Sequence, residues 1–399
     1  MPDAVSPTAS SARLQSVEDW IVTEGRLEPD LGRFVDQLMK RVVVAGLPIW
    51  RFYIGLQLVH PQMVATGVLW RRDSGYEEVP RQHGILTSAS YVGSPMQEVR
   101  NTGQPVRYRL DAALPEGAHL VLHEMKAGGS VDYTAFPMKL GRRGSTPVAT
   151  FSTDRPGGFS DEDIADLKRL VDMMGAVAEI FIYRSISETV TDTYLGHIVG
   201  EQILSGRIKR GDGREINAVL WFSDLRDFTG LNERMPAADL LELLNNYLQL
   251  VGDALKANGG EILKFIGDGV MAYFPAEDAL FLPMVTNSAI AAARQLIDDI
   301  EAANEARAAA GGHDPVRFGI GLHVGPVTFG NIGTEDRLDF TVIGPAVNRA
   351  ARLESLTKQL GVPVLASAEF NAVSTVPLKS LGKHGLRGVP EPVEVFTLP

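Results

Sequence analysis

Two aspartates lie where they could hold a divalent cation. Asp224 directly follows residues 218–223, an apolar segment with the composition of a buried strand. Asp268 lies in a Gly-Asp-Gly turn between residues 261–266 and 270–274, which both have strand character. Taken singly, each is more simply interpreted as a turn or helix-capping aspartate. Together, at the ends of neighbouring strands, two hard oxygen donors suit Mg²⁺ or Mn²⁺, which complete their coordination with substrate phosphates.

The residues after Asp224 turn toward a helix. The first backbone N–H groups of a helix have no partner within it and can face an anion. A phosphate chain could therefore lie beside the carboxylate. The candidate phosphate-binding residues in this turn are Leu225, Phe228 and Thr229.

The bulk composition excludes several classes of protein. The chain has 399 residues, 45% of them hydrophobic and 22% charged, which predicts two ordinary globular units. A formal net charge of −11 disfavours nucleic acid and anionic membrane surfaces as partners, and with them a polymerase-like role. The absence of cysteine excludes disulfides, thiolate metal sites and cysteine nucleophiles.

No targeting segment is expected. Residues 1–13 have neither the basic start nor the apolar stretch of a signal peptide and are predicted to be a disordered leader. Later apolar stretches, such as 176–183 and 289–293, are much shorter than the roughly 20 residues of a spanning helix. We therefore expect no membrane partner and a cytoplasmic location.

An antiparallel sheet flanked by helices is expected in the first half of the chain. Residues 14–44 have a helical pattern that is broken around 27–30. Strand patterns follow at residues 50–58, 64–72, 106–110, 133–140 and 147–152. His119 and His123 stand four residues apart, but together with His60 and His83 they are interpreted as ordinary polar residues rather than metal or haem ligands.

A long helix is expected to start near Asp161. Ser160 and Asp163 have capping-box spacing, and acidic residues crowd the first turn. Apolar residues then follow a heptad pattern at Ile164, Leu167, Val171, Met174, Ala178 and Phe181. The stripe is either a dimer seam or the face of a terminal helix that docks on its own sheet, and the sequence leaves both open. The domain boundary is expected between residues 185 and 215, where the chain becomes polar and glycine-rich.

The second half is expected to be an α+β sandwich, with helices packed on a mainly antiparallel sheet. Helical patterns cover residues 237–258, 285–310 and 346–360. Strand patterns cover residues 218–223, 261–266, 270–274, 316–324, 326–332 and 392–398.

Five segments of this half resemble the class III nucleotidyl cyclases in order and spacing. They are FSDLRDFTGLNE, GGEILKFIGDGVMAYFP, GIGLHVGPVTFGNIG, DFTVIGPAVNRAARLE and LRGVPEPVEVFTL. The resemblance covers residues 218–399 and implies a ferredoxin-like, palm-type catalytic fold. It implies that Asp224 and Asp268 hold two metal ions, one that activates the ribose 3′-hydroxyl and one that grips the triphosphate.

The same resemblance assigns the transition-state residues. Asn348 matches the asparagine that orients the ribose, and Arg352 matches the arginine that stabilises charge on the α-phosphorus. Their i,i+4 spacing independently places both on one helix face. Without the family, Arg352 would be interpreted as a surface ion-pair partner.

Base selectivity follows from two further matches. Lys264 stands where adenylate cyclases carry the lysine that meets adenine and where guanylate cyclases usually carry an acid. Thr341 stands at its partner position, where a hydroxyl can accept from the adenine amino group. Arg387 replaces the usual triphosphate-binding lysine and keeps its charge. Pro345 and Arg349 depart from the common pattern and leave the local loop geometry open.

The resemblance implies conversion of ATP to cyclic AMP with Mg²⁺ or Mn²⁺, two per active site, in a homodimer with composite sites. A guanylate cyclase and a catalytically silent ligand-binding dimeric scaffold remain the alternatives. The first half resembles a GAF-type sensor domain in its topology and its closing segment FSDEDIADLKRLVDMMG, which implies a possible small-molecule ligand. The expected organisation is a leader at 1–13, a GAF-like domain at 14–184, a helical linker at 185–215 and a catalytic domain at 216–399.

Overall fold

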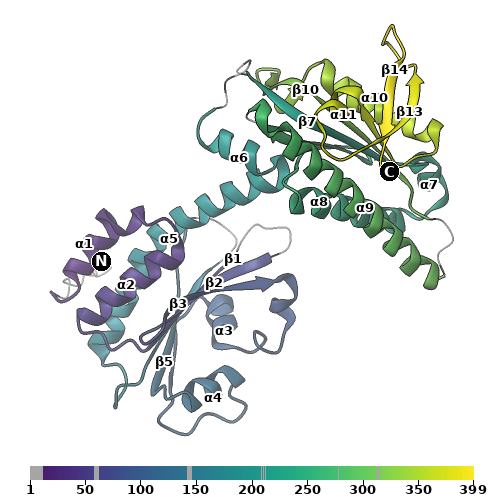
Figure 1. The fold of residues 1–399 in the computed structure, drawn as a ribbon. Coiled ribbons are helices and arrows are strands. Elements are labelled where there is room, and N and C mark those ends of the chain that lie inside the picture. Colours follow the sequence, from purple (N-terminus) through teal and green to yellow (C-terminus); the bar gives the residue numbers. More distant parts are fainter. Residues whose placement is uncertain are drawn as a thin grey trace. The chain divides into compact units, whose positions relative to one another are not determined.

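The computed structural model describes residues 12–57, 63–141, 146–207, 209, 211, 213–276, 278–311 and 315–399. They belong to two compact units, Met1–Val190 and Thr191–Pro399 (Figure 1). The division lies inside the segment 185–215 for which we expected a linker, and most of the expected leader lies outside the described residues. Each unit has its own sheet and its own hydrophobic core.

The N-terminal unit contains a six-stranded sheet in which all neighbouring strands are antiparallel. The strand order is β3-β2-β1-β6-β5-β4. The expected antiparallel sheet is confirmed, although β3 was not predicted. The strands are β1 (Arg51–Gln57), β2 (Met63–Arg71), β3 (Gly75–Gln82), β4 (Val106–Arg109), β5 (Asp132–Pro137) and β6 (Val148–Thr153).

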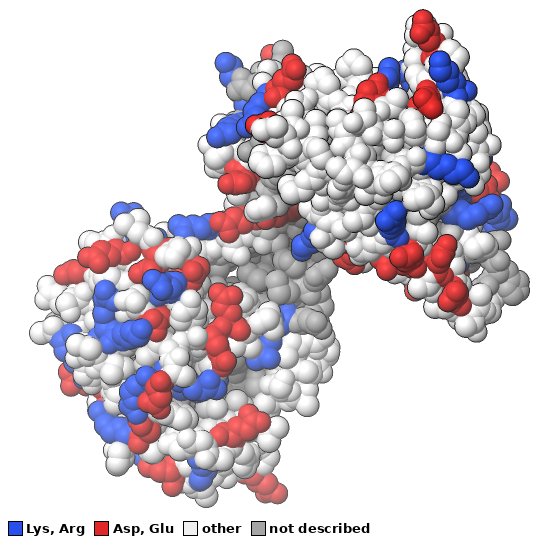
Figure 2. Space-filling model, in the orientation of Figure 1, with Lys and Arg blue, Asp and Glu red and all other residues white. Residues whose placement is uncertain are grey.

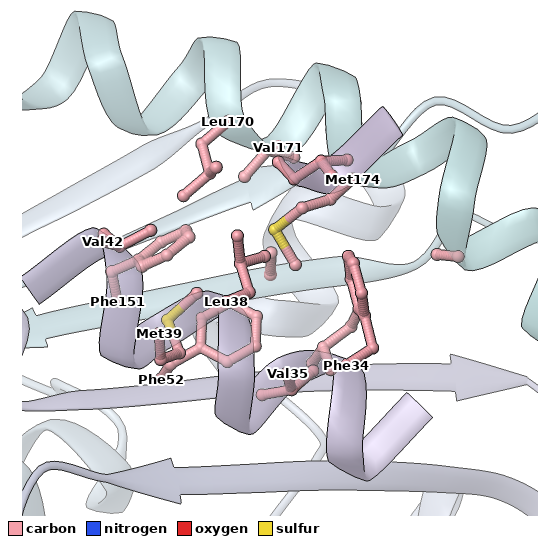
Figure 3. Close-up of a cluster of buried hydrophobic side chains, with 14 of the residues drawn as sticks. Phe34, Val35, Leu38, Met39, Val42, Phe52, Phe151, Leu170, Val171 and Met174 are labelled. Atoms are coloured by element: carbon pink, nitrogen blue, oxygen red, sulfur yellow. The ribbon is translucent and has the colours of Figure 1, made fainter. Parts of the chain in front are cut away.

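Each face of this sheet has its own helices. The main core lies under α1 (Gln15–Thr23), α2 (Leu31–Val44) and α5 (Asp161–Leu195). Side chains of α2 and α5 meet those of β1 and β6 there, among them Leu38, Phe52, Phe151 and Met174 (Figure 3). A smaller core on the other face joins α3 (Pro95–Thr102) and α4 (Leu120–Ala127) to Tyr133 and Val148 of the sheet.

The heptad-spaced residues of α5 face their own sheet. Leu167, Val171, Met174, Ala178 and Phe181 are buried in the main core, and Ile164 packs against it. The stripe is therefore the docking face of a terminal helix, and its interpretation as a dimer seam is wrong because the sheet already covers it. The predicted capping box is confirmed: Ser160 Oγ accepts from the Asp163 N–H, and the Asp163 carboxylate accepts from the Ser160 N–H.

The C-terminal unit contains an eight-stranded sheet in the order β13-β14-β12-β10-β7-β9-β8, with β11 paired to β10. Only the β10–β12 pairing among the described strands of this sheet is parallel, which confirms the expected mainly antiparallel α+β architecture. The strands are β7 (Gly213–Leu225), β8 (Glu261–Ile266), β9 (Gly269–Ala276), β10 (Phe318–Gly333), β11 (Leu338–Ile343), β12 (Val364–Ser367), β13 (Lys379–His384) and β14 (Val393–Thr397).

The expectation of two strands at 316–324 and 326–332 is wrong, because β10 is continuous. Gly325 and Pro326 suggested a break, since proline cannot donate to a ladder. On one edge β10 pairs with β7 along most of its length. On the other edge it pairs with β12 at residues 320–322 and with β11 from Thr328 onward. Pro326 falls between these two partners, where that edge has no ladder bond to lose.

The alternation of β7 places its side chains in two different cores of the C-terminal unit. Val219 and Trp221 face the core under α8 (Ala237–Ala257) and α9 (Leu282–Ala309). Ala218 and Leu220 face the core that includes residues of α6 (His197–Leu204) and α10 (Pro345–Leu360). The helices therefore lie on both faces of the sheet.

One helical segment of the described chain, Ala279–Ala309, is long and apolar enough by composition to span a membrane. This differs from the expectation drawn from the shorter apolar stretches. Ala289, Ala293 and Leu296 of this segment are buried in the core of the C-terminal unit. One such helix is weak evidence for a membrane span, because a helix in the core of a protein passes the same test of length and composition.

Candidate active site

The two predicted metal aspartates lie at the same end of neighbouring strands. Asp224 is the penultimate residue of β7, and Asp268 occupies the turn between β8 and β9. The β7–β9 ladder runs up to Ser223 opposite Val270, next to both aspartates. A Cβ built on Gly269 would lie 3.4 Å from Asp224 Oδ1, so the turn packs directly against that carboxylate.

The carboxylate of Asp224 is electrostatically frustrated. Burial raises the pKa of Asp224 to about 8, and the nearby carboxylates of Asp268 and Glu354 add to the shift. Asp224 Oδ1 is buried and accepts no hydrogen bond from any described residue. A buried, unpartnered carboxylate oxygen beside a second aspartate fits a divalent cation such as Mg²⁺ or Mn²⁺. No group of three or more His, Cys, Asp or Glu suited to a metal occurs in the described part of the chain.

Two further residues belong to this cluster and were missed from the sequence. Glu354 of α10 approaches β10, where a Cβ on Gly319 would lie 2.6 Å from Glu354 Oε1. Burial raises the pKa of Glu354, while the nearby Arg226 opposes the shift. Tyr247 of α8 is 1% exposed, and burial raises its pKa too. Glu354 closes the motif that contains Arg352, but the sequence alone gave no sign that it would face the aspartates.

The turn after Asp224 leads directly into a short helix, α7 (Phe228–Arg234). Leu225 ends β7 and is buried, whereas Phe228 and Thr229 lie in the first helical turn, where N–H groups lack intrahelical partners. Asp227 precedes the helix with φ +60°, a conformation that costs a non-glycine residue energy. The predicted phosphate-binding residues thus lie beside the aspartate pair.

Asn348 and Arg352 share one face of α10, as their spacing predicted. Glu354 lies about 200° around the helix from Arg352, so the pair points away from the side that meets β10. A Cβ on Gly388 would lie 3.3 Å from Arg352 Nη2, which places Arg352 beside the loop of Arg387. One chain thus brings Asn348, Arg352 and Arg387 to the same side of α10 but not to the aspartates.

Lys264 forms an ion pair with Asp339 of β11. Thr341 lies two residues further along β11, on the same face as Asp339. The predicted base-recognising residues therefore lie on two neighbouring segments, with Asp339 as a third member. Asp339 was missed because β11 itself was not predicted.

The comparison with known families bears on residues 214–398. They match the family model described as adenylate and guanylate cyclase catalytic domain. This part of the chain is a cyclase catalytic domain. An adenylate cyclase of Anabaena cylindrica is 31% identical over 213 residues, 51% of this chain and 41% of that protein. The adenylate cyclase, terminal-differentiation specific, of Dictyostelium discoideum is 29% identical over 222 residues, 54% of this chain and 9% of that protein. The chain therefore spans less than half the length of either relative.

Solved structures similar to the cyclase domain include both activities. The adenylyl cyclase CyaB from P. aeruginosa is 28% identical with a TM-score of 0.43 and covers 47% of this chain and 96% of that chain. The guanylyl cyclase Cya2 is 27% identical with a TM-score of 0.41 and covers 46% of this chain and 92% of that chain. The matching family includes both adenylate and guanylate cyclases, so membership leaves the choice between ATP and GTP open.

The two departures from the family pattern have structural roles in the cyclase domain. Pro345 is the first residue of α10, where the missing N–H of proline removes no helical bond. Arg349 donates to Glu369 at 2.6 Å. Neither residue displaces Asn348 or Arg352, so the loop geometry that the sequence left open keeps the catalytic helix intact.

The histidines of the N-terminal unit include a structural cap. His119 is the N-cap of α4, where its Nδ1 accepts from the Val121 N–H at 3.2 Å. Its Nε2 lies 3.0 Å from the carbonyl oxygen of Ala89. His123 is exposed, the side chain of His83 and all of His60 lie outside the described parts, and the interpretation of His119 as an ordinary polar residue is confirmed.

Proposed function

We propose that the protein is an adenylate cyclase that converts ATP to 3′,5′-cyclic AMP and pyrophosphate. The observation that carries the proposal is the buried, unpartnered Oδ1 of the Asp224 carboxylate beside Asp268 in a cyclase catalytic domain. A catalytically silent scaffold has no need of this arrangement, because uncompensated buried charge destabilises a fold. The retained Asn348 and Arg352 support turnover as well.

In the proposed reaction the ribose 3′-oxygen bonds to the α-phosphorus, and the bond from that phosphorus to the β-phosphate oxygen breaks. The hydroxyl proton is lost to solvent and pyrophosphate leaves. Mg²⁺ or Mn²⁺ held by Asp224 and Asp268 would supply Lewis acidity at the ribose hydroxyl and neutralise the triphosphate charge. Leu225, Phe228 and Thr229 would hold the phosphates through the backbone around the start of α7.

Arg352 would stabilise charge on the α-phosphate, Asn348 would orient the ribose, and Arg387 would bind the triphosphate. These residues lie on the side of α10 away from Glu354, which supports a role at the aspartates of a second chain. We therefore propose a homodimer with two composite sites, each with the aspartates of one subunit and the α10 residues of the other. The geometry of α10 supports this arrangement.

Lys264 supports ATP over GTP as the substrate. A lysine can donate to an acceptor on adenine but offers nothing to the amino group of guanine, which needs an acceptor. Thr341 would accept from the adenine amino group. Asp339 would hold the Lys264 ammonium in place before the base arrives.

We further propose that the N-terminal unit is a GAF-type sensor that regulates the cyclase domain in the cytoplasm. Its six-stranded antiparallel sheet with helices on both faces supports a globular sensor of this type. The long α5 helix supports a connection to the cyclase domain, because it begins in one unit and ends in the other.

The test is to incubate the purified chain with ATP or GTP plus Mn²⁺ or Mg²⁺ and identify the products by chromatography. Cyclic AMP in excess of cyclic GMP is expected, and the Asp268→Asn variant should make neither. Cyclic GMP as the main product would identify a guanylate cyclase. No cyclic product with any combination would leave the scaffold as the answer and contradict the proposal.

A further inference from the structure

The second face of the N-terminal sheet carries charged and aromatic residues at its centre. Phe52 and Ile54 of β1 face the main core, so Arg51, Tyr53 and Gly55 face the other side. The strand register places Arg51 opposite Ser152, which lies opposite Tyr133. A buried arginine therefore starts a row of polar side chains across the sheet.

A cavity of about 270 Å³ lies between this face and helices α3 and α4. Its walls are partly apolar, with Met96 from α3 and Met125 from α4. Its polar lining includes three arginines, Arg51, Arg81 and Arg100, against one carboxylate, Glu124. The cavity is thus strongly cationic in a chain whose formal net charge is −11.

The Nε of Arg51 is buried, and the partly buried guanidinium has no matching anion among the described residues. Its Nε has no hydrogen-bond partner among the described residues, and it forms no ion pair with a carboxylate there. Burial lowers the pKa of Arg51, which reports the cost of keeping this charge away from water. The guanidinium carbon of Arg51 lies 6.0 Å from the centroid of the Tyr53 ring.

Arg100 is the second arginine with unused donors. Its Nε is also buried and lacks a hydrogen-bond partner within the described ranges. Its Nη1 donates to Tyr91 Oη at 2.8 Å, which orients the guanidinium without neutralising it. Glu124 is exposed and ion-pairs with none of the three arginines in the part of the chain that the structure describes.

Exposed charges on the N-terminal unit differ from the arginines in the cavity. Lysine, arginine, aspartate and glutamate side chains are mixed over the face of the N-terminal unit that Figure 2 shows. Exposed charges of this kind pair loosely and are screened by solvent. The buried Nε donors of Arg51 and Arg100 are less accessible to water, so an anion that enters the cavity would satisfy them.

We propose that this cavity binds a small compound with a carboxylate or phosphate group on an apolar body. Arg51 and Arg100 hold the oxyanion, since the planar guanidinium fork matches both groups. The methionines and tyrosines of the walls contact the apolar body. Arg81 adds to the positive field.

The experiment uses the full chain labelled with ¹³C at the methionine methyl groups. Benzoate and inorganic phosphate are the probes, and benzamide serves as the uncharged analogue of benzoate. Saturable shifts of the Met96 and Met125 signals are expected with at least one anion, and benzamide should bind about tenfold more weakly or worse. Tighter binding of benzoate would indicate that the ligand of the cavity carries a carboxylate. Tighter binding of phosphate would indicate that it carries a phosphate group.

Arg51→Met supplies the decisive variant. It should weaken binding of the anion about tenfold or more and raise the melting temperature of the ligand-free protein, because an unpaired buried charge is removed. Arg100→Gln should weaken binding as well. The control is Arg71→Gln, because Arg71 lies opposite Arg51 in the sheet but pairs with Glu77, and binding should not change.

Three results would overturn the proposal. The first is that neither anion shifts the two methionine signals up to its solubility limit. The second is that benzamide binds as tightly as benzoate. The third is that Arg51→Met lowers the melting temperature while anion binding stays unchanged, which would make Arg51 a purely structural residue.

Discussion

The two units carry buried, unsatisfied charge of opposite sign. In the cyclase domain the aspartate pair and Glu354 gather negative charge at the end of β7, and one oxygen of Asp224 has no partner among the described residues. In the N-terminal unit Arg51 and Arg100 leave guanidinium nitrogens unpartnered within the described chain. Each group costs stability in the absence of a ligand. The sign of the uncompensated charge therefore indicates what each site takes: a cation in one unit and an anion in the other.

The largest effect is expected at the acidic site. Asp224→Asn should lower cyclase activity by about 10³-fold or more, because metal binding contributes several kcal/mol to such reactions. In metal-free buffer at pH 7 to 8 the same variant should raise the melting temperature, since ionisation of Asp224 is disfavoured in the folded protein but not in the unfolded chain. Activity assays and differential scanning fluorimetry measure the two effects.

The matched control is Asp253→Asn, an exposed aspartate of α8 that accepts from Gln249. It should change neither quantity. If Asp224→Asn were instead less stable and still active, the acidic cluster would be an ordinary structural feature, and the contrast between the two units would disappear.

The next effect tests whether the α10 residues act across subunits. Arg352→Ala should lower activity by about 10²-fold or more, the size expected for a lost transition-state donor. An equal mixture of the Arg352→Ala and Asp224→Ala chains should recover about a quarter of wild-type activity, because half of the dimers are mixed and each has one intact site. Mixed dimers, confirmed by differently tagged chains, that stay inactive would contradict composite sites.

A smaller change is expected at the base-recognising residues. Lys264→Glu should lower turnover of ATP about 10²-fold and raise the ratio of GTP to ATP turnover, because an acid offers the acceptor that guanine needs. The variant also sets two carboxylates, at 264 and Asp339, against each other. Lys256→Glu, at the exposed end of α8, is the control and should leave the ratio unchanged.

The smallest effect concerns stability alone and comes from His323 of β10. Burial lowers the pKa of His323 from 6.5 to about 4. As the pH falls, the unfolded chain binds the proton before the folded protein does. The contribution of neutral His323 to the free energy of unfolding is therefore fully present above pH 6.5 and is lost as the pH falls toward 4. Chemical denaturation at pH 7 and pH 4.5 should differ by about 2 kcal/mol more in wild type than in His323→Gln. Equal pH dependence in both proteins would show that His323 is not buried in its neutral form.

The sequence predicted the acidic site better than the cationic one. Asp224, Asp268 and their strands were predicted because local patterns mark both: an apolar run ends at one, and a glycine turn contains the other. Arg51 begins a strand as many surface arginines do, and only the packing of the sheet against α3 and α4 shows that it lines a cavity. Non-local burial of this kind has no signature in local sequence.

The wrong predictions have the same origin. The heptad pattern of α5 correctly marked an apolar stripe, but the pattern cannot say whether a sheet or a second helix covers it. Gly325 and Pro326 suggested a break in β10, and only the change of partner strand on one edge explains why the strand continues. Glu354 joined the active site through the packing of α10 on β10, which helix periodicity alone does not determine.

The most direct test of the central claim is a crystal structure with Mn²⁺ and a nonhydrolysable ATP analogue. Anomalous scattering locates the manganese independently of the nucleotide. Manganese is expected to bind the carboxylates of Asp224 and Asp268 and the triphosphate, next to the start of α7. Nucleotide bound in the cyclase domain with no manganese at either carboxylate would contradict it.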